Sequence, residues 1–110
     1  MPDACGKPDI TDWDKDHVDL KWTPPKNDGG APIEKYIIEK KEKNGEWEPA
    51  AEVPAEQTSG TAPNLIEGKE YQFRVRAVNK GGPGAPSEPT EPKIAKPRHR
   101  KSSSLQINGN

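Results

Sequence analysis

The sequence predicts an all-β protein built as an antiparallel β-sandwich. Several short segments alternate apolar and polar residues, and glycine- and proline-rich turns separate them. No segment repeats apolar residues at the i, i+3, i+4 spacing of an amphipathic helix, so we expect essentially no helix. The chain has 110 residues, and 28% of them are hydrophobic. That low share favours disorder, but the apolar residues gather in the predicted strands and include three tryptophans, which fill a core efficiently.

Two strands are predicted near the N-terminus. The first begins after Pro8 and ends near Trp13, which we expect to pack under a loop. In the second, residues 18–22, Val18, Leu20 and Trp22 alternate with two charged residues, so these three side chains should point into the core. The prolines at 24 and 25 end this strand, and residues 26–32 form a loop.

A hairpin is predicted next, around Asn44-Gly45. Residues 33–41 form its first strand, with Tyr36 and Ile38 on one face, and the returning strand carries Trp47 and ends near Pro54. Asn-Gly between two strand patterns is a strong hairpin signal because both residues tolerate a positive φ.

The clearest strand covers residues 71–79, where Tyr71, Phe73 and Val75 alternate with polar residues. Residues 80–86 predict a long flexible loop. A last strand is expected within residues 87–95, confined to a sheet edge because its prolines cannot donate hydrogen bonds.

Both ends of the chain differ in character from the predicted domain, residues 8–95. We expect residues 1–7 to form a flexible lead-in. We expect residues 96–110, which are basic and serine-rich, to form a disordered tail. The single cysteine, Cys5, cannot form an internal disulfide and is expected to be an incidental exposed thiol.

The composition argues against catalysis and against several classes of ligand. One cysteine and two histidines supply neither a nucleophile–base pair nor a zinc ligand set, so we expect no enzyme, metal or cofactor. A net charge of −1 gives no general attraction to nucleic acid or anionic membranes. No apolar run is long enough for a membrane span, and no signal peptide is visible.

Three stretches resemble the fibronectin type III family: Trp22, residues 65–75 and residues 79–84. The resemblance covers residues 8–95 and implies an immunoglobulin-like sandwich of about seven strands. Leu65 and Tyr71 resemble its tyrosine corner, in which the phenol hydrogen-bonds to the backbone upstream. The core residues expected on these grounds are Trp22, Tyr36, Leu65, Tyr71, Phe73 and Val75.

The fifth strand of that fold should lie near residues 58–64. Gly60 and Pro63 weaken a strand there, and the apolar inward residues usual in the family are missing. We still predict a strand at this place, short and poorly protected from hydrogen exchange.

A narrower resemblance is to domains of the giant muscle filament proteins titin, twitchin and projectin, with myosin-binding protein C as a relative. It rests on residues 18–25, on 27–33 with their Gly-Gly-Ala-Pro-Ile run, and on 36–41. It implies a non-catalytic structural module in the sarcomere. The implied partners are myosin or another thick-filament protein and neighbouring immunoglobulin or fibronectin type III domains. The isolated domain is expected to be monomeric.

Two other functions stay open: an extracellular adhesion or receptor module, and a domain flanking a muscle protein kinase. The sequence contains neither an Arg-Gly-Asp motif nor an Asn-x-Ser/Thr glycosylation acceptor, which argues against the extracellular function. Sequence beyond residue 110 would decide the kinase reading.

Seven residues are candidates for protein binding. Trp47 either covers a sheet edge or offers an exposed anchor. Arg74 and Arg76 lie outward on the clearest strand and form either a solvated face or a docking surface for an acidic rod. The two loops that carry Asn27, Asp28, Asn79 and Lys80 should meet at one end of the sandwich, either as simple turns or as a surface that sets the angle to a neighbouring domain.

The basic tail contains a candidate phosphorylation site. Arg100-Lys101 precedes three serines, with Ser103 the best acceptor and Ser102 and Ser104 next. Such matches also arise by chance in basic tails. A phosphate there would add almost two negative charges beside the basic residues.

Overall fold

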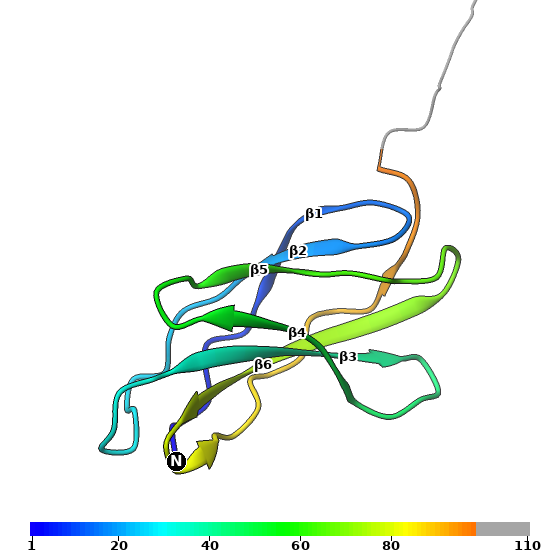
Figure 1. Ribbon diagram of the computed structural model, residues 1–110. Helices are drawn as coiled ribbons and strands as arrows, with labels where there is room; N and C mark the ends of the chain where they lie inside the picture. Colours follow the sequence, from blue (N-terminus) through cyan, green and yellow to red (C-terminus); the bar gives the residue numbers. More distant parts are fainter. Residues whose placement is uncertain (99–110) are drawn as a thin grey trace, which may run out of the picture.

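A computed structural model describes residues 1–98 and shows two antiparallel sheets packed face to face (Figure 1). Residues 1–98 contain no helix, so none could cross a membrane. The predicted all-β sandwich is therefore confirmed, with eight strands instead of about seven. In chain order they are β1 (Asp9–Trp13), β2 (Val18–Lys21), β3 (Lys35–Glu42), β4 (Glu48–Pro54), β5 (Ser59–Ala62), β6 (Glu70–Asn79), β7 (Gly82–Pro83) and β8 (Lys93–Ile94).

The strands divide into a three-stranded and a five-stranded sheet. The smaller sheet has the order β1-β2-β5, and the larger has the order β4-β3-β6 with β7 and β8 both pairing with β6. The β3–β6 ladder runs without a register shift from the pair Lys35–Val78 to the pair Glu42–Tyr71. This long ladder makes β3 and β6 the backbone of the molecule and fixes which of their side chains face outward.

The core lies between the sheets. All six predicted core residues are buried there, and Tyr36, Tyr71 and Phe73 are among the largest fully buried side chains. The Trp22 ring meets the Tyr36 ring edge-on at 5.5 Å, an arrangement that aromatic quadrupoles favour. The alternating residues of β2 and β6 therefore supply the core from both sheets.

A tyrosine corner closes one end of the core. The Tyr71 hydroxyl accepts a hydrogen bond of 2.9 Å from the backbone N–H of Ile66, five residues upstream. This is the contact that the resemblance implied for Leu65 and Tyr71, and Leu65 packs in the core beside it.

The predicted hairpin forms, with a small difference in its second strand. The Gly45 N–H donates to the Glu42 carbonyl at 2.9 Å, which closes the turn between β3 and β4. However, β4 begins at Glu48, so Trp47 precedes the strand that was expected to carry it.

The fifth strand is present, and its glycine has a packing reason. Gly60 faces the core from β5, where a Cβ atom would lie 2.6 Å from Val53 Cγ2 and 3.1 Å from Ile38 Cδ1. The inward residues of β5 are thus Gly60 and Ala62, because β3 and β4 already fill the space that larger side chains would need.

The segment after β6 is more ordered than predicted. Residues 80–86 were expected to be a flexible loop, yet they contain β7, which pairs with Val78 and Asn79. Only Lys93–Ile94 of the predicted last strand pairs as a strand. Between them, Ser87 and Thr90 are buried, and their side-chain oxygens accept the N–H groups of Val75 and Phe73 at 3.0 and 3.1 Å. The backbone N–H groups of Ser87 and Thr90 also donate to the carbonyls of Val75 and Phe73, at 2.9 and 2.8 Å. This proline-interrupted segment is therefore bonded to β6 through both backbone and hydroxyl groups.

The expectation for Cys5 was wrong. Its side chain is 5% exposed and belongs to the core cluster. The residues around it follow the sandwich, since Asp3 N donates to Asn27 O at 3.0 Å and Gly6 N donates to Thr23 O at 3.1 Å. The predicted domain limits, residues 8–95, thus leave out residues that pack on the domain. Burial raises the pKa of the Cys5 thiol to about 11.

Candidate protein-interaction surfaces

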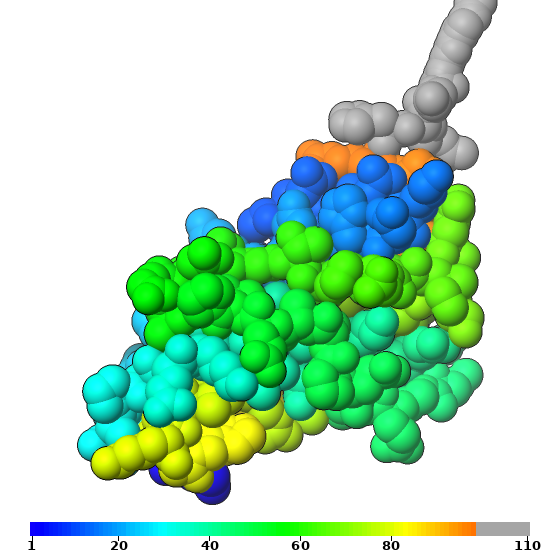
Figure 2. Space-filling view, viewed as in Figure 1, coloured from blue at the N-terminus to red at the C-terminus, as the bar shows by residue number. Residues whose placement is uncertain are grey.

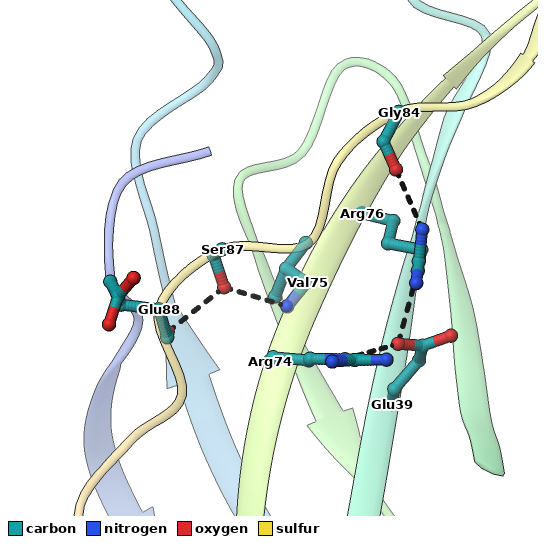
Figure 3. Close-up of polar contacts among 7 residues, drawn as sticks. All are labelled: Glu39, Arg74, Val75, Arg76, Gly84, Ser87 and Glu88. Atoms are coloured by element: carbon teal, nitrogen blue, oxygen red, sulfur yellow. Dashed lines mark hydrogen bonds and ion pairs between the residues drawn. The ribbon is translucent and has the colours of Figure 1, made fainter. Parts of the chain in front are cut away.

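The outward face of the larger sheet carries a compact charged cluster. Glu39 on β3 lies opposite Arg74 on β6, and its Oε1 atom accepts from Arg74 Nε at 2.6 Å and from Arg76 Nε at 3.2 Å (Figure 3). Arg76 also donates through Nη1 to the Gly84 carbonyl at 2.9 Å, which ties the cluster to the segment after β7. The register of the β3–β6 ladder places Glu39 opposite Arg74.

This cluster is less solvated than an ordinary surface ion pair. The Glu39 side chain is only 14% exposed, and those of Arg74 and Arg76 are 17% and 27% exposed. Partial burial strengthens charge-assisted hydrogen bonds, so the arginine side chains are held in fixed positions. Two guanidinium groups share one carboxylate, which leaves one positive charge uncompensated within the cluster.

Trp47 extends the same surface. Its ring is half-buried, and the Arg74 guanidinium lies over it at 4.2 Å from the ring centroid. The indole is therefore neither fully exposed nor fully buried. It forms one side of an aromatic and cationic patch, defined here as Trp47, Glu39, Arg74 and Arg76 and called the β3–β6 patch.

The two predicted loops meet at the end of the sandwich where the chain begins. Figure 2 shows residues 27–32 and 82–86 side by side there. Met1 lies against Gly29 and Pro2 against Gly84, so the first residues contact both loops. Asn79 joins the loops, because its Nδ2 donates to the Asp28 carbonyl at 2.7 Å and its Oδ1 accepts from Gly81 N at 2.8 Å. We call this end the N-terminal pole.

The four predicted loop residues differ in their exposure. Asn79 is only 3% exposed, so it positions the loops instead of touching a partner. The Asn27 and Asp28 side chains accept from Gly29 N and Gly30 N, which stabilises their own turn, and both residues remain exposed, as does Lys80. The pole therefore offers a preorganised but largely polar surface.

Other candidates have a different outcome. The predicted phosphorylation sites Ser102, Ser103 and Ser104 lie outside the described residues. The buried hydroxyls of Ser87 and Thr90 were not predicted, although their alternation with prolines in an edge segment is a signal that could have indicated them.

Taken together, these features define the class of the protein: an immunoglobulin-like β-sandwich with a tyrosine corner and a glycine-rich pole. Comparison with known proteins agrees, since the family model for the fibronectin type III domain matches residues 4–93. The chain belongs to the fibronectin type III family.

Its relatives include several muscle proteins. The chain is 41% identical over 95 residues to the titin homolog of Caenorhabditis elegans. The matched region covers 86% of the chain and, after rounding, 0% of that protein. It is 39% identical over 93 residues to human cardiac-type myosin-binding protein C, covering 84% of the chain and 7% of that protein. The chain thus spans less than a tenth of the length of these relatives.

A solved structure extends the similarity. The twitchin kinase region from C. elegans matches with a TM-score of 0.84 at 37% identity, covering 94% of the chain and 18% of that structure. The resemblance to titin, twitchin and myosin-binding protein C inferred from the sequence is therefore confirmed.

Proposed function

We propose that this chain is a non-catalytic structural and protein-interaction module of a giant muscle protein associated with the thick filament. The observation that carries the proposal is the identity of about 40% to the titin homolog and to myosin-binding protein C over nearly the whole domain. The module would act in the cytoplasmic myofibril and contribute to sarcomere architecture and elasticity.

The placement of the two ends supports a mechanical role. Residues 1–6 lie at the N-terminal pole, whereas residues 93–98 lie at the opposite end of the sandwich (Figure 1). Tension between the ends would act across the antiparallel pairing of β1 with β2 and of β8 with β6. Stretching would therefore have to break strand pairing and open the core around Trp22, Tyr71 and Phe73.

The β3–β6 patch supports binding to an acidic partner. Its fixed guanidinium groups, its uncompensated positive charge and its half-buried tryptophan offer both charge and apolar area at low cost in conformational entropy. The rod of myosin or a similar thick-filament surface is the partner proposed here. The N-terminal pole is proposed to contact the preceding immunoglobulin or fibronectin type III domain.

Co-sedimentation with myosin filaments tests this function. We expect the purified chain to pellet with myosin and not with actin, and to do so equally without residues 96–110. Replacing Arg74 and Arg76 by glutamine should reduce pelleting, because the cationic groups are lost. Lys35→Gln with Glu52→Gln is the matched control, since this exposed ion pair lies on the same sheet outside the patch.

Each outcome decides between explanations. Pelleting that is lost with residues 96–110 would transfer the activity to the basic tail and make Ser103 a credible switch. Absence of pelleting at high concentration would contradict direct filament binding and leave a spacer role.

A second function is favoured by one comparison. The matched twitchin structure is described as a kinase region, so a position beside a kinase domain is the alternative. The test is to join this domain to an adjoining kinase domain and to measure the kinase activity with and without it. A change in that activity would support this alternative.

A further inference from the structure

Trp13, at the end of β1, is contacted by two cations from one short segment. Lys93 Nζ lies 3.5 Å from the centroid of the Trp13 ring, and Arg98 Cζ lies 4.6 Å from it. Figure 2 shows the last described residues lying over the β1–β2 end of the molecule. Cation–π attraction of this kind is strongest for tryptophan.

Asp12 completes the site from the neighbouring position. Its Oδ1 accepts a hydrogen bond from Arg98 Nη1 and another, of 2.8 Å, from the backbone N–H of Trp13. The hydrogen bond from Arg98 is the main cause that lowers the pKa of the Asp12 carboxyl, so the carboxylate remains ionised over a wide pH range. Trp13 and Asp12 thus offer an aromatic face and an anion side by side.

The charges of the two segments are complementary over a larger area. The β1–β2 hairpin, residues 9–21, contains five aspartates and two lysines and is therefore acidic, whereas residues 93–98 contain Lys93, Lys96 and Arg98. Burial is the main cause that lowers the pKa of Lys93, and repulsion from Lys96 and Arg98 adds to it. Without the acidic hairpin beside them, three cations within six residues would repel one another.

The backbone alone does not hold this segment. Ala95 is the last residue of it that pairs through its backbone, donating to Lys69 O at 2.9 Å and accepting from Gly68 N at 2.8 Å. Beyond Ala95, within the described residues, the contacts of Arg98 with Asp12 and Trp13 bring the chain across to the smaller sheet. The path of the outgoing chain is therefore set by side-chain charge.

We propose that Asp12 and Trp13 form a binding site for the basic segment Lys93–Arg98, and that this site is an electrostatic latch that fixes the direction in which the chain leaves the domain. The latch joins the outgoing segment, which follows the larger sheet, to β1 of the smaller sheet. Its ion pair is about half exposed, at 51% for Asp12 and 40% for Arg98, so salt weakens it.

Nuclear spin relaxation of the backbone amides in the full 110-residue chain tests the latch. We expect Asp12→Asn, Arg98→Gln and Trp13→Leu each to increase the motion of Lys96 and Arg98, with the unlatched fraction rising about two- to five-fold for each lost contact. Trypsin should cleave the Arg98–His99 bond faster by a similar factor in Asp12→Asn and Trp13→Leu. High salt should act on the unaltered chain like Asp12→Asn.

Trp47→Leu is the matched control, because it removes the other Trp–Arg stack, which lies on the larger sheet. It should leave residues 96–98 unchanged. If Trp13→Leu unfolds the domain, the two charge variants at half-exposed positions still test the proposal. Unchanged motion and cleavage in Asp12→Asn and unchanged motion in Arg98→Gln would overturn it, and so would an equal effect of Trp47→Leu. The test uses the purified chain alone, so its result is independent of filament binding.

Discussion

At the scale of single residues, Tyr71 shows how one hydroxyl secures a turn. Its oxygen accepts from Ile66 N, and its ring stacks near Phe73 at 6.1 Å. In Tyr71→Phe the ring remains but the backbone N–H loses its partner, so we expect a loss of about 1–3 kcal/mol in the free energy of unfolding. Denaturant titration measures this. Tyr36→Phe is the control, because it removes the hydroxyl of a second buried tyrosine that has no part in the corner and leaves its ring in place. An equal loss in both variants would contradict the role of the corner.

Cys5 gives a second prediction at this scale. Its thiol is buried and its pKa is raised to about 11. In the folded chain at pH 8, a reagent therefore cannot reach the sulfur, and the sulfur is not in the reactive thiolate form. We expect a thiol reagent to label Cys5 only as fast as the domain, or the segment that covers it, opens. Full labelling at the rate of a free cysteine would show that residues 1–6 do not cover the thiol.

The same burial gives Cys5 a defined pH dependence. The unfolded thiol ionises near 9.0, whereas the folded one keeps its proton until about pH 11. The folded state therefore binds more protons in this window, and stability falls as the pH rises from 9 to 11. Cys5→Ala should lack this part of the alkaline decline.

At the scale of elements, β5 depends on the absence of a side chain. A Cβ at Gly60 would collide with Val53 and Ile38, so Gly60→Ala should push β5 away from the larger sheet. Overpacking of this kind costs about 1–3 kcal/mol, which a thermal or denaturant melt would detect.

Gly45→Ala serves as the control for this element. A Cβ there lies 3.5 Å from Glu42 Cβ, which is an ordinary contact, and its φ is not positive. We expect the control to melt close to the unaltered chain. A stable Gly60→Ala variant would mean that β5 has room to move and that the glycine has no packing role.

At the scale of the whole molecule, the two sheets share one core, and Trp22 is the large side chain that spans it. It follows β2, packs edge-on against Tyr36 of β3 and approaches Gly60 of β5. Trp22→Ala should cost about 3–5 kcal/mol and unfold the domain or nearly so. Circular dichroism on heating would show it, and a cooperative melt near that of the unaltered chain would overturn the core assignment.

Trp22→Phe separates the loss of aromatic packing from the loss of the indole N–H group. The Trp22 Nε1 atom is buried with no hydrogen-bond partner within the described residues, so phenylalanine removes an unsatisfied donor while it keeps an aromatic ring. We expect this variant to remain folded and to lose less stability than Trp22→Ala.

The sequence alone determined the fold class, most of the strands and the core. Alternation in residues 18–22 and 71–79 is a property of a few neighbouring residues, and the period of two shows directly which side chains enter the core. The tyrosine corner was predictable through the resemblance to the fibronectin type III family, because Leu65 and Tyr71 match its pattern around a turn.

Only the tertiary structure decided the contacts between distant segments. Cys5 is buried because residues 1–6 pack against residues 23–27 and because Pro2 lies beside Gly84. The packing role of Gly60 depends on Val53 and Ile38, which belong to other strands. The β3–β6 patch required the register that sets Glu39 opposite Arg74, and the latch required Lys93 and Arg98 to reach Trp13. Local patterns carry the periodicity of one strand, but they contain no information on which strands become neighbours, and these sites are made of such neighbours.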